Sequence, residues 1–196
     1  MKVLTNITEI SNGSQFSTPI LFIIFNRPDI TKEVLGRVRE IKPTRLFVVA
    51  DGPRDSVKGD KDKVAQTRKL IDRIDWDCEV IKNYSETNLG CRNRVSSGID
   101  WFFKNVDMGI IIEDDCLPNK SFFYFCEELL HRYVNQSKVM MISGNNFQDD
   151  NTRGNYSYYF SKYSHIWGWA TWKRAWNNYD VEMNSLSEFK RDNAIK

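Results

Sequence analysis

The chain has 196 residues, of which 41% are hydrophobic and 28% charged, a composition typical of a folded domain and not of a disordered segment. Its 28 basic and 26 acidic residues nearly cancel, so the charge indicates no nucleic-acid partner. The four cysteines show no CxxC pair and no zinc-ligand spacing, which predicts free thiols in a reducing compartment.

Residues 1–18 form a polar leader with one lysine and no apolar core, so they resemble neither a signal peptide nor a membrane span. The longest apolar run, residues 20–25, is too short to cross a bilayer, and we expect no transmembrane segment. The sequence therefore predicts a cytoplasmic chain with one domain over residues 19–196. Any membrane association would be peripheral, through a partner or an acceptor.

Apolar strand patterns and helical patterns alternate strictly from residue 19 to residue 143. Strands are predicted at residues 19–25, 46–50, 78–81, 109–112 and 139–143. Helices are predicted at residues 28–42, 60–74 and 91–104, and another begins near Pro118 with Phe122, Cys126, Leu129 and Tyr133 facing inward. This alternation predicts an α/β fold with a mostly parallel, Rossmann-like central sheet and helices on both faces.

The pattern changes after Gly144. Residues 145–156 are polar and rich in turn formers, which predicts a mobile loop, and residues 156–163 fit an edge strand. Three tryptophans follow within residues 165–172, and Trp176 belongs to a short predicted helix. No closing element is expected beyond it.

Polar side chains follow three of the predicted strands at the point where each strand ends. Asn26 and Arg27 follow the first strand, Asp51 follows the second, and three carboxylates at residues 113–115 follow the fourth. Carboxyl ends of parallel strands meet at one edge of the sheet, where open α/β folds bind ligands. Three adjacent carboxylates repel one another unless a cation lies between them, so the sequence predicts a divalent metal at this edge.

The segment over residues 88–94 adds a helix start with two arginines, Arg92 and Arg94. Free amides and the positive end of the helix dipole favour a phosphate there, and arginine binds phosphate oxygens in pairs. Together with the acidic edge, this pattern predicts a pocket for a nucleotide diphosphate.

Plainer interpretations remain open for each motif. The acidic strand end could be a solvated loop or a helix-cap cluster, and Asp51 could serve only the turn formed with Gly52 and Pro53. Arginines at a helix start are often surface charge, and a tryptophan cluster is more often core than ligand platform.

Four segments together resemble the GT-A glycosyltransferases. They are residues 25–28 (FNRP), 49–52 (VADG), 112–115 (IEDD) and 167–169 (WGW). The pattern is most similar to the N-acetylglucosaminyltransferase I type and to bacterial relatives that transfer sugars onto surface polysaccharides. The acidic trio resembles the DxD motif of that fold, and the resemblance spans residues 19–180.

The resemblance implies a role for each matching position. Asp115 would ligate Mn²⁺ or Mg²⁺. The implied nucleotide-sugar-binding residues are Asn26, Arg27 and Asp51 around the base, Arg92 and Asn93 along the diphosphate, Asp114 at ribose or sugar, Glu113 at the donor sugar, and Gly168 and Trp169 in the donor and acceptor wall. The loop over residues 145–156 would cover the bound donor.

The implied function is metal-dependent transfer of a sugar, with inversion, from a nucleotide-diphospho-sugar to a hydroxyl of a glycan or other acceptor. The donor expected is a UDP-sugar. The family's general base lies downstream of the tryptophan segment, so it is expected beyond Lys196, and we expect a domain truncated at its C-terminus. Asp180 and Glu182 are the nearby acids, and neither has a matching context.

Two other functions remain as alternatives. One is a non-catalytic domain that binds a nucleotide sugar or a glycan, which the lack of an assigned base favours and the acidic trio opposes. The other, less favoured, is a sugar-phosphate nucleotidyltransferase. That class needs a glycine-rich loop after the first strand, and residues 26–28 are nothing like one.

Overall fold

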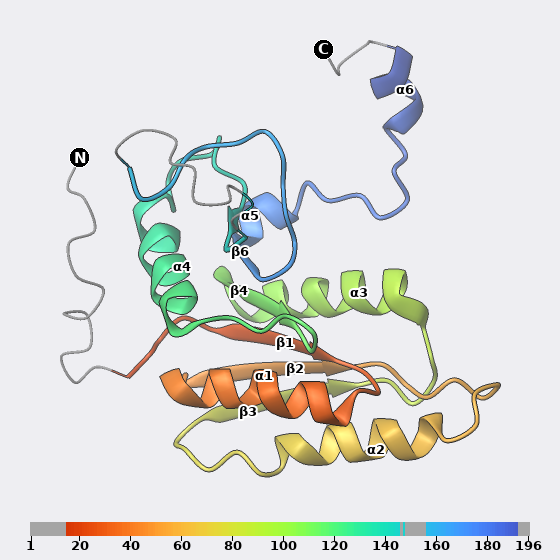
Figure 1. Ribbon diagram of the computed structural model, residues 1–196. Coiled ribbons are helices and arrows are strands. Elements are labelled where there is room, and N and C mark those ends of the chain that lie inside the picture. The colour runs from red at the N-terminus through yellow and green to blue at the C-terminus, as the bar shows by residue number, and fades with distance from the viewer. Residues whose placement is uncertain (1–14, 146, 148–155, 192–196) are drawn as a thin grey trace.

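The computed structural model describes residues 15–145, 147 and 156–191, and six strands in this part of the chain form one sheet (Figure 1). The spatial order of the strands is β3-β2-β1-β4-β6-β5. Their bounds are β1 Ile20–Ile24, β2 Arg45–Ala50, β3 Glu79–Tyr84, β4 Met108–Glu113, β5 Ile142–Ser143 and β6 Trp169–Trp172. Strands β1 to β4 are mutually parallel, whereas β6 runs antiparallel to both β4 and β5.

Helices cover both faces of this sheet, as Figure 1 shows, which confirms the predicted α/β fold class. Their bounds are α1 Pro28–Ile41, α2 Asp60–Ile71, α3 Gly90–Asn105, α4 Lys120–Arg132, α5 Lys173–Trp176 and α6 Leu186–Arg191. Helices α1, α2 and α4 share one apolar cluster with alternate strand residues such as Phe22. Helix α3 packs on the opposite face against Leu21 and Phe47. The central strands are apolar on both faces because both faces are covered.

The topology contains a switch point between β1 and β4. The chain moves outward from β1 through β2 to β3, and α3 then crosses the other face so that β4 pairs with the far side of β1. In open α/β sheets the crevice for ligands lies at the carboxyl ends of the strands at such a point. The residues after β1 and after β4 therefore flank the position where a ligand is expected.

The second half of the chain differs from the sequence prediction in three places. Residues 156–163 form no strand: Tyr158 packs instead against Phe125 of α4, and its hydroxyl lies 2.6 Å from that of Tyr133, directly after the helix. The sheet edge is taken by β5, which is shorter than the predicted strand over residues 139–143. The exposed helix α6 forms where no closing element was expected.

Smaller differences concern α4 and β3. The inward residues of α4 are Phe123, Cys126, Leu129 and Leu130, so Phe122 and Tyr133 are only half-buried. Strand β3 extends to Tyr84, beyond its predicted end, because it pairs with the whole of β2. The expected covering loop, residues 145–156, lies almost entirely outside the described residues.

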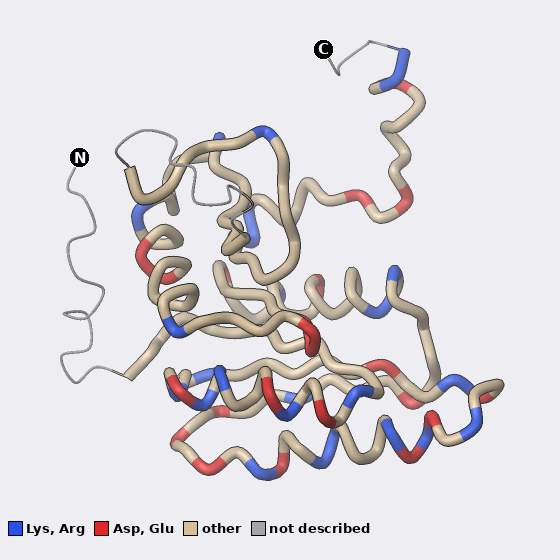
Figure 2. The backbone as a smooth tube through the Cα atoms, viewed as in Figure 1, with Lys and Arg blue, Asp and Glu red and all other residues tan. Residues whose placement is uncertain are grey.

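Charged side chains are unevenly distributed over the fold. Figure 2 shows Lys, Arg, Asp and Glu concentrated along α1 and α2, whereas the segment leading into β6 is almost uncharged. Lys162 is the one Lys, Arg, Asp or Glu residue between residues 156 and 172. No helix among the described residues is long and apolar enough to cross a membrane.

Candidate functional site

The carboxyl ends of β1 and β4 carry side chains that the sequence predicts to be functional, and the structure brings them into contact. Asp114 is 2% exposed, and its Oδ2 accepts hydrogen bonds from the Phe25 amide (3.1 Å) and from the Thr31 hydroxyl (3.4 Å). Its Oδ1 accepts a hydrogen bond from Arg27 Nη2 at 2.5 Å. The Asp114 carboxylate therefore ties the end of β4 to the end of β1 and to the first turn of α1.

The Arg27 guanidinium bridges two members of the acidic trio. Its Nη1 donates to Asp115 Oδ2 at 2.8 Å while Nη2 binds Asp114. The side chains of Arg27 and Asp115 are 42% and 48% exposed. The sequence predicted a divalent metal between these carboxylates, whereas the structure places the Arg27 guanidinium there. The available signal for this ion pair was the basic residue at the end of the neighbouring strand.

Burial and charge set the ionisation of this cluster. Burial raises the pKa of Asp114, and the Arg27 charge partly opposes that effect. Burial also raises the pKa of Glu113, with further contributions from the charges of Asp115 and Asp114. For Arg27, burial acts to lower the pKa, but the two aspartates outweigh it and the pKa is raised. The arginine therefore stays charged and compensates a carboxylate pair that would otherwise repel.

Asp115 is the carboxylate at this edge that could contact a metal ion shared with a ligand. Within the described residues, no group of three or more His, Cys, Asp or Glu side chains is arranged to hold a metal. A hard divalent ion that accompanies a nucleotide needs only one or two carboxylates, because phosphate oxygens and water complete its coordination. Half-exposed Asp115 can supply such a carboxylate, whereas buried Asp114 is already engaged by the protein.

Asp51 caps the start of α3. Its Oδ1 accepts hydrogen bonds from the amides of Gly52 and Leu89 at 2.9 Å, and its Oδ2 accepts one from the Gly90 amide at 3.0 Å. Two amides at the predicted phosphate-binding helix start are thus bound to a carboxylate of the chain itself. This geometry favours the structural interpretation of Asp51, in which it joins the end of β2 to α3.

Asn26 is fixed by a pair that sequence reasoning did not identify. Its side-chain amide donates to Asp60 Oδ1 at 2.5 Å, and the same buried carboxylate binds the Arg54 backbone amide and guanidinium. Hydrogen bonds from Arg54 hold the pKa of Asp60 well below its usual range. The acid at the first position of α2 was the available signal, but nothing in the sequence pairs it with residues 26 and 54.

The first turn of α3 places its polar residues in different environments. Arg92 is exposed and binds Glu182 (2.9 Å) and the carbonyl oxygen of Val181 (2.5 Å). Asn93 donates to the carbonyl oxygen of Leu89 at 3.3 Å. Arg94 is buried and donates to Ala50 and Asn83, at the ends of β2 and β3. Of the two arginines, Arg92 alone is open to solvent.

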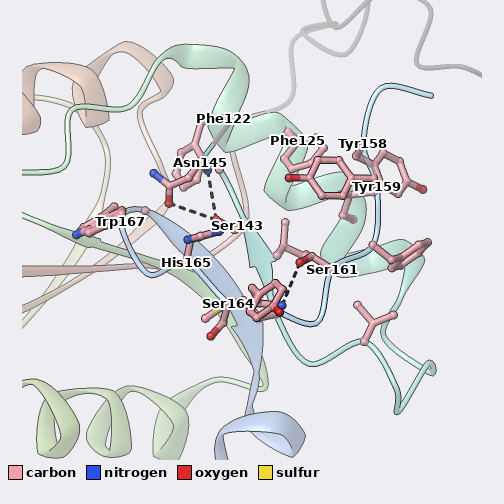
Figure 3. A pocket seen from close by; sticks show the side chains of 18 of the residues that line it. Phe122, Phe125, Ser143, Asn145, Tyr158, Tyr159, Ser161, Ser164, His165 and Trp167 are labelled. Atoms are coloured by element: carbon pink, nitrogen blue, oxygen red, sulfur yellow. Dashed lines mark hydrogen bonds between the residues drawn. The ribbon is translucent and has the colours of Figure 1, made fainter. Parts of the chain in front are cut away.

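A groove of about 1530 Å³ begins at Asp115 and extends along α4. Figure 3 shows Phe122 and Phe125 of α4 lining it together with Tyr158, Ser161, His165 and Trp167 of the segment before β6, and Tyr158 lies beside Phe125. Gly168 lines the same groove, has a φ of 78°, and accepts a hydrogen bond from the Gly144 amide at 3.1 Å. Trp169 is buried in β6, and exposed Trp167 faces the groove.

Among the described residues, Asp115 is where the groove meets the cluster formed by Arg27, Asp114 and Asp115. The predicted base and diphosphate residues Asn26, Asp51 and Arg92 do not line the groove, whereas the predicted metal ligand Asp115 and the wall residue Gly168 do. The structure thus separates two regions, a polar one over β1, β2 and α3 and an aromatic one over α4.

Comparison with known proteins identifies no family. No protein-family model matches the sequence, and no curated protein matches it. Among solved structures, a 4-diphosphocytidyl-2C-methyl-D-erythritol synthase from Anaerococcus prevotii is similar with a TM-score of 0.44 and 12% identity, over 90% of this chain and 84% of that one. A second protein of that description gives a TM-score of 0.38 and 15% identity, over 90% and 86%. Likeness at this level carries no conclusion about substrate or reaction.

Proposed function

We propose that this chain is the donor-binding domain of a metal-dependent glycosyltransferase of the GT-A type. It would transfer a sugar from a nucleotide-diphospho-sugar, expected to be a UDP-sugar, to a hydroxyl acceptor with inversion. The observation that supports this most is the meeting of the β1 end with the acidic end of β4 at the topological switch point. A polar edge of this kind, open to an aromatic groove, suits a charged donor beside a bulkier acceptor.

In this proposal the nucleotide lies over the ends of β1 and β2. The base lies near Asn26, whose orientation Asp60 fixes, and near the turn that Asp51 ties to α3. Half-buried Glu113 faces the ribose and donor sugar. Asp114, for which the resemblance implies the same contact, is buried and supports the site by holding the end of β1. The diphosphate runs past the first turn of α3, where Arg92 and Asn93 lie, and binding it there requires Arg92 to leave Glu182.

Asp115 would hold Mn²⁺ or Mg²⁺ together with diphosphate oxygens. When bound, the ion would neutralise charge on the departing diphosphate. The chain's own contribution is positioning: Asp115 stands between the polar edge and the groove, and Gly168 lines the groove. Trp169, the other expected wall residue, is buried in β6 and does not line the groove. An acceptor hydroxyl presented from the groove would then lie close to the donor sugar.

A non-catalytic domain that binds a nucleotide sugar is the second candidate. The acids near the tryptophan segment are already committed: Asp180 accepts hydrogen bonds from the amides of Glu182 (2.9 Å) and Asn184 (2.7 Å), and Glu182 pairs with Arg92. Neither carboxylate is poised as a general base. This observation favours binding without turnover by the residues that the structure describes.

Titration calorimetry with UDP and with UDP-sugars tests the proposal. We expect binding in the presence of Mn²⁺ and its loss in EDTA or in Asp115→Asn. Asp107→Asn is the matched control, because Asp107 directly precedes β4 as an exposed acid at the opposite edge of the sheet. Binding that does not depend on metal, or that survives Asp115→Asn, would show the metal bridge to be wrong.

Product analysis of the same samples separates the two candidates. Release of free sugar or transfer of sugar to an added glycan, in the wild type but not in Asp115→Asn, supports the enzyme. Metal-dependent binding with neither reaction supports the non-catalytic domain.

A further inference from the structure

One guanidinium serves two carboxylates that differ sharply in their surroundings. The Arg27 contact with Asp114 is on a buried carboxylate, which the Phe25 amide and the Thr31 hydroxyl also hold. Its contact with Asp115 is between two half-exposed groups, and the Cys116 thiol also donates to that carboxylate across a long distance of 3.9 Å. The first contact is therefore built into the fold, and the second is open to exchange.

The backbone supports this division. Arg27 directly precedes α1, and its carbonyl oxygen accepts a hydrogen bond from the Thr31 amide at 2.9 Å. Pro28 has a fixed φ and also restricts the backbone of Arg27 before it. The main chain at the end of β1 is thus fixed while the long side chain remains partly in solvent. The planar guanidinium of arginine can donate to two acceptors through different nitrogens, so one of these hydrogen bonds can break while the other stays intact.

We propose that Arg27 is the resident counter-ion of the Asp114–Asp115 pair and that a divalent cation replaces only its contact with Asp115. This inference rests on the proposed function, which places the metal at Asp115. A guanidinium and a metal ion on one carboxylate repel each other, so Arg27 weakens metal binding when no nucleotide is present. Negative charge on a diphosphate offsets that repulsion, so metal and nucleotide bind together and the metal alone binds poorly.

Binding of Mn²⁺ alone, without nucleotide, tests the proposal. We expect Arg27→Gln to bind Mn²⁺ about tenfold tighter than the wild type, at the low end of what a charge within hydrogen-bonding distance does to a partly exposed site. The signal of free Mn²⁺ in electron paramagnetic resonance measures this affinity. Arg37→Gln is the control, since it removes the same charge from an exposed position on α1.

A double variant tests whether the gain in Mn²⁺ affinity depends on Asp115. Adding Asp115→Asn to Arg27→Gln should return Mn²⁺ affinity to the wild-type level or below it. In thermal unfolding, Arg27→Gln should have a lower Tm than the wild type without metal, because its two carboxylates repel, and Mn²⁺ should raise that Tm. The Tm of the wild type and of Arg37→Gln should respond little.

Arg27→Lys keeps the test valid if Arg27→Gln does not fold. The lysine ammonium retains the charge but cannot bind both carboxylates with separate planar donors as arginine does. We therefore expect a gain in Mn²⁺ affinity that is smaller than in Arg27→Gln and still depends on Asp115. The proposal is wrong if neither variant binds Mn²⁺ tighter than the wild type while the wild type with UDP binds it through Asp115. If no variant binds Mn²⁺ through Asp115, with or without UDP, the proposed function fails as well.

Discussion

Asp114 and Asp115 are neighbours in the sequence, yet their side chains are 2% and 48% exposed. Asp114 points into the junction of β1, β4 and α1, whereas Asp115 points toward the groove. The sequence predicted that the trio would mark a site but not which member the fold would bury. That depends on partners such as Phe25 and Thr31, which lie more than eighty residues away in the chain.

This difference predicts unequal effects of the two alanine substitutions on stability. Asp114→Ala leaves the Phe25 amide and one arm of Arg27 without their acceptor, so we expect a loss of about 2–3 kcal/mol in the free energy of unfolding. Asp115→Ala breaks one solvent-exposed ion pair and should cost less than about 1 kcal/mol. Urea denaturation of both variants measures the difference; equal losses would contradict the assigned roles.

Asp60 predicts a pH dependence of stability. Arg54 lowers the pKa of Asp60 in the folded protein, so the ionised carboxylate stabilises the fold above the ordinary aspartate pKa of 3.8. This contribution is lost as the pH falls below that value. Asp60→Asn cannot ionise. The variant should be less stable than the wild type by about 2 kcal/mol at neutral pH, and the gap should narrow below about pH 4.

Urea denaturation at several pH values measures this gap, and taking the difference cancels acids that the two proteins share, including Glu113 and Asp114, whose raised pKa values act with the opposite sign. Asp62→Asn is the control, an exposed acid in the same turn of α2. A gap that stays constant from neutral pH to about pH 3 would show that the charge of Asp60 does not stabilise the fold.

Among the elements, the loops after β2 and β3 depend on one close approach. A Cβ added to Gly52 would lie 2.4 Å from the carbonyl carbon of Thr87, so the two loops touch backbone to backbone. The Asn88 side chain also donates to the Gly52 carbonyl oxygen at 2.8 Å. This contact holds Asp51 within hydrogen-bonding distance of the first amides of α3.

Two glycine substitutions should therefore change the free energy of unfolding in opposite directions. Gly52→Ala forces the loops apart, and we expect it to lower the free energy of unfolding by about 1–3 kcal/mol. Gly36→Ala adds a Cβ with nothing within 4 Å in the middle of α1 and should stabilise the chain by about 0.5–1 kcal/mol. Thermal or urea unfolding measures both. If Gly52→Ala had the same free energy of unfolding as the wild type, the close approach of the two loops would not contribute to stability.

The spacing of apolar residues predicts a helix or strand well where one face of that element is buried against the core. The helix predicted over residues 28–42 is confirmed as α1, Pro28–Ile41, in which Val34, Val38 and Ile41 are buried. The spacing fails as a predictor at residues 156–163, where alternating aromatics resemble a strand although Tyr158 packs on α4. Alternation shows which side chains are apolar, but not whether a sheet or a helix receives them.

At the scale of the whole molecule, topology was the most predictable feature. Strict alternation of strand and helix predicts a parallel sheet, and the sheet then brings the ends of β1, β2 and β4 to one edge. The charged partners at that edge could not be predicted, because Arg27 with Asp114 and Arg92 with Glu182 join residues nearly ninety positions apart. Long-range pairs of this kind follow from the assembled fold and not from local pattern.

The most direct test of the donor site is paramagnetic broadening by Mn²⁺ in the presence of UDP, followed by NMR. We expect strong broadening of the amides of Phe25, Arg27 and Cys116 at the carboxyl edge, little at Ile20 and Arg45 at the opposite edge, and loss of the effect in Asp115→Asn. Broadening that centres elsewhere in the chain, or that persists unchanged in Asp115→Asn, would contradict a metal-bridged nucleotide at the end of β4.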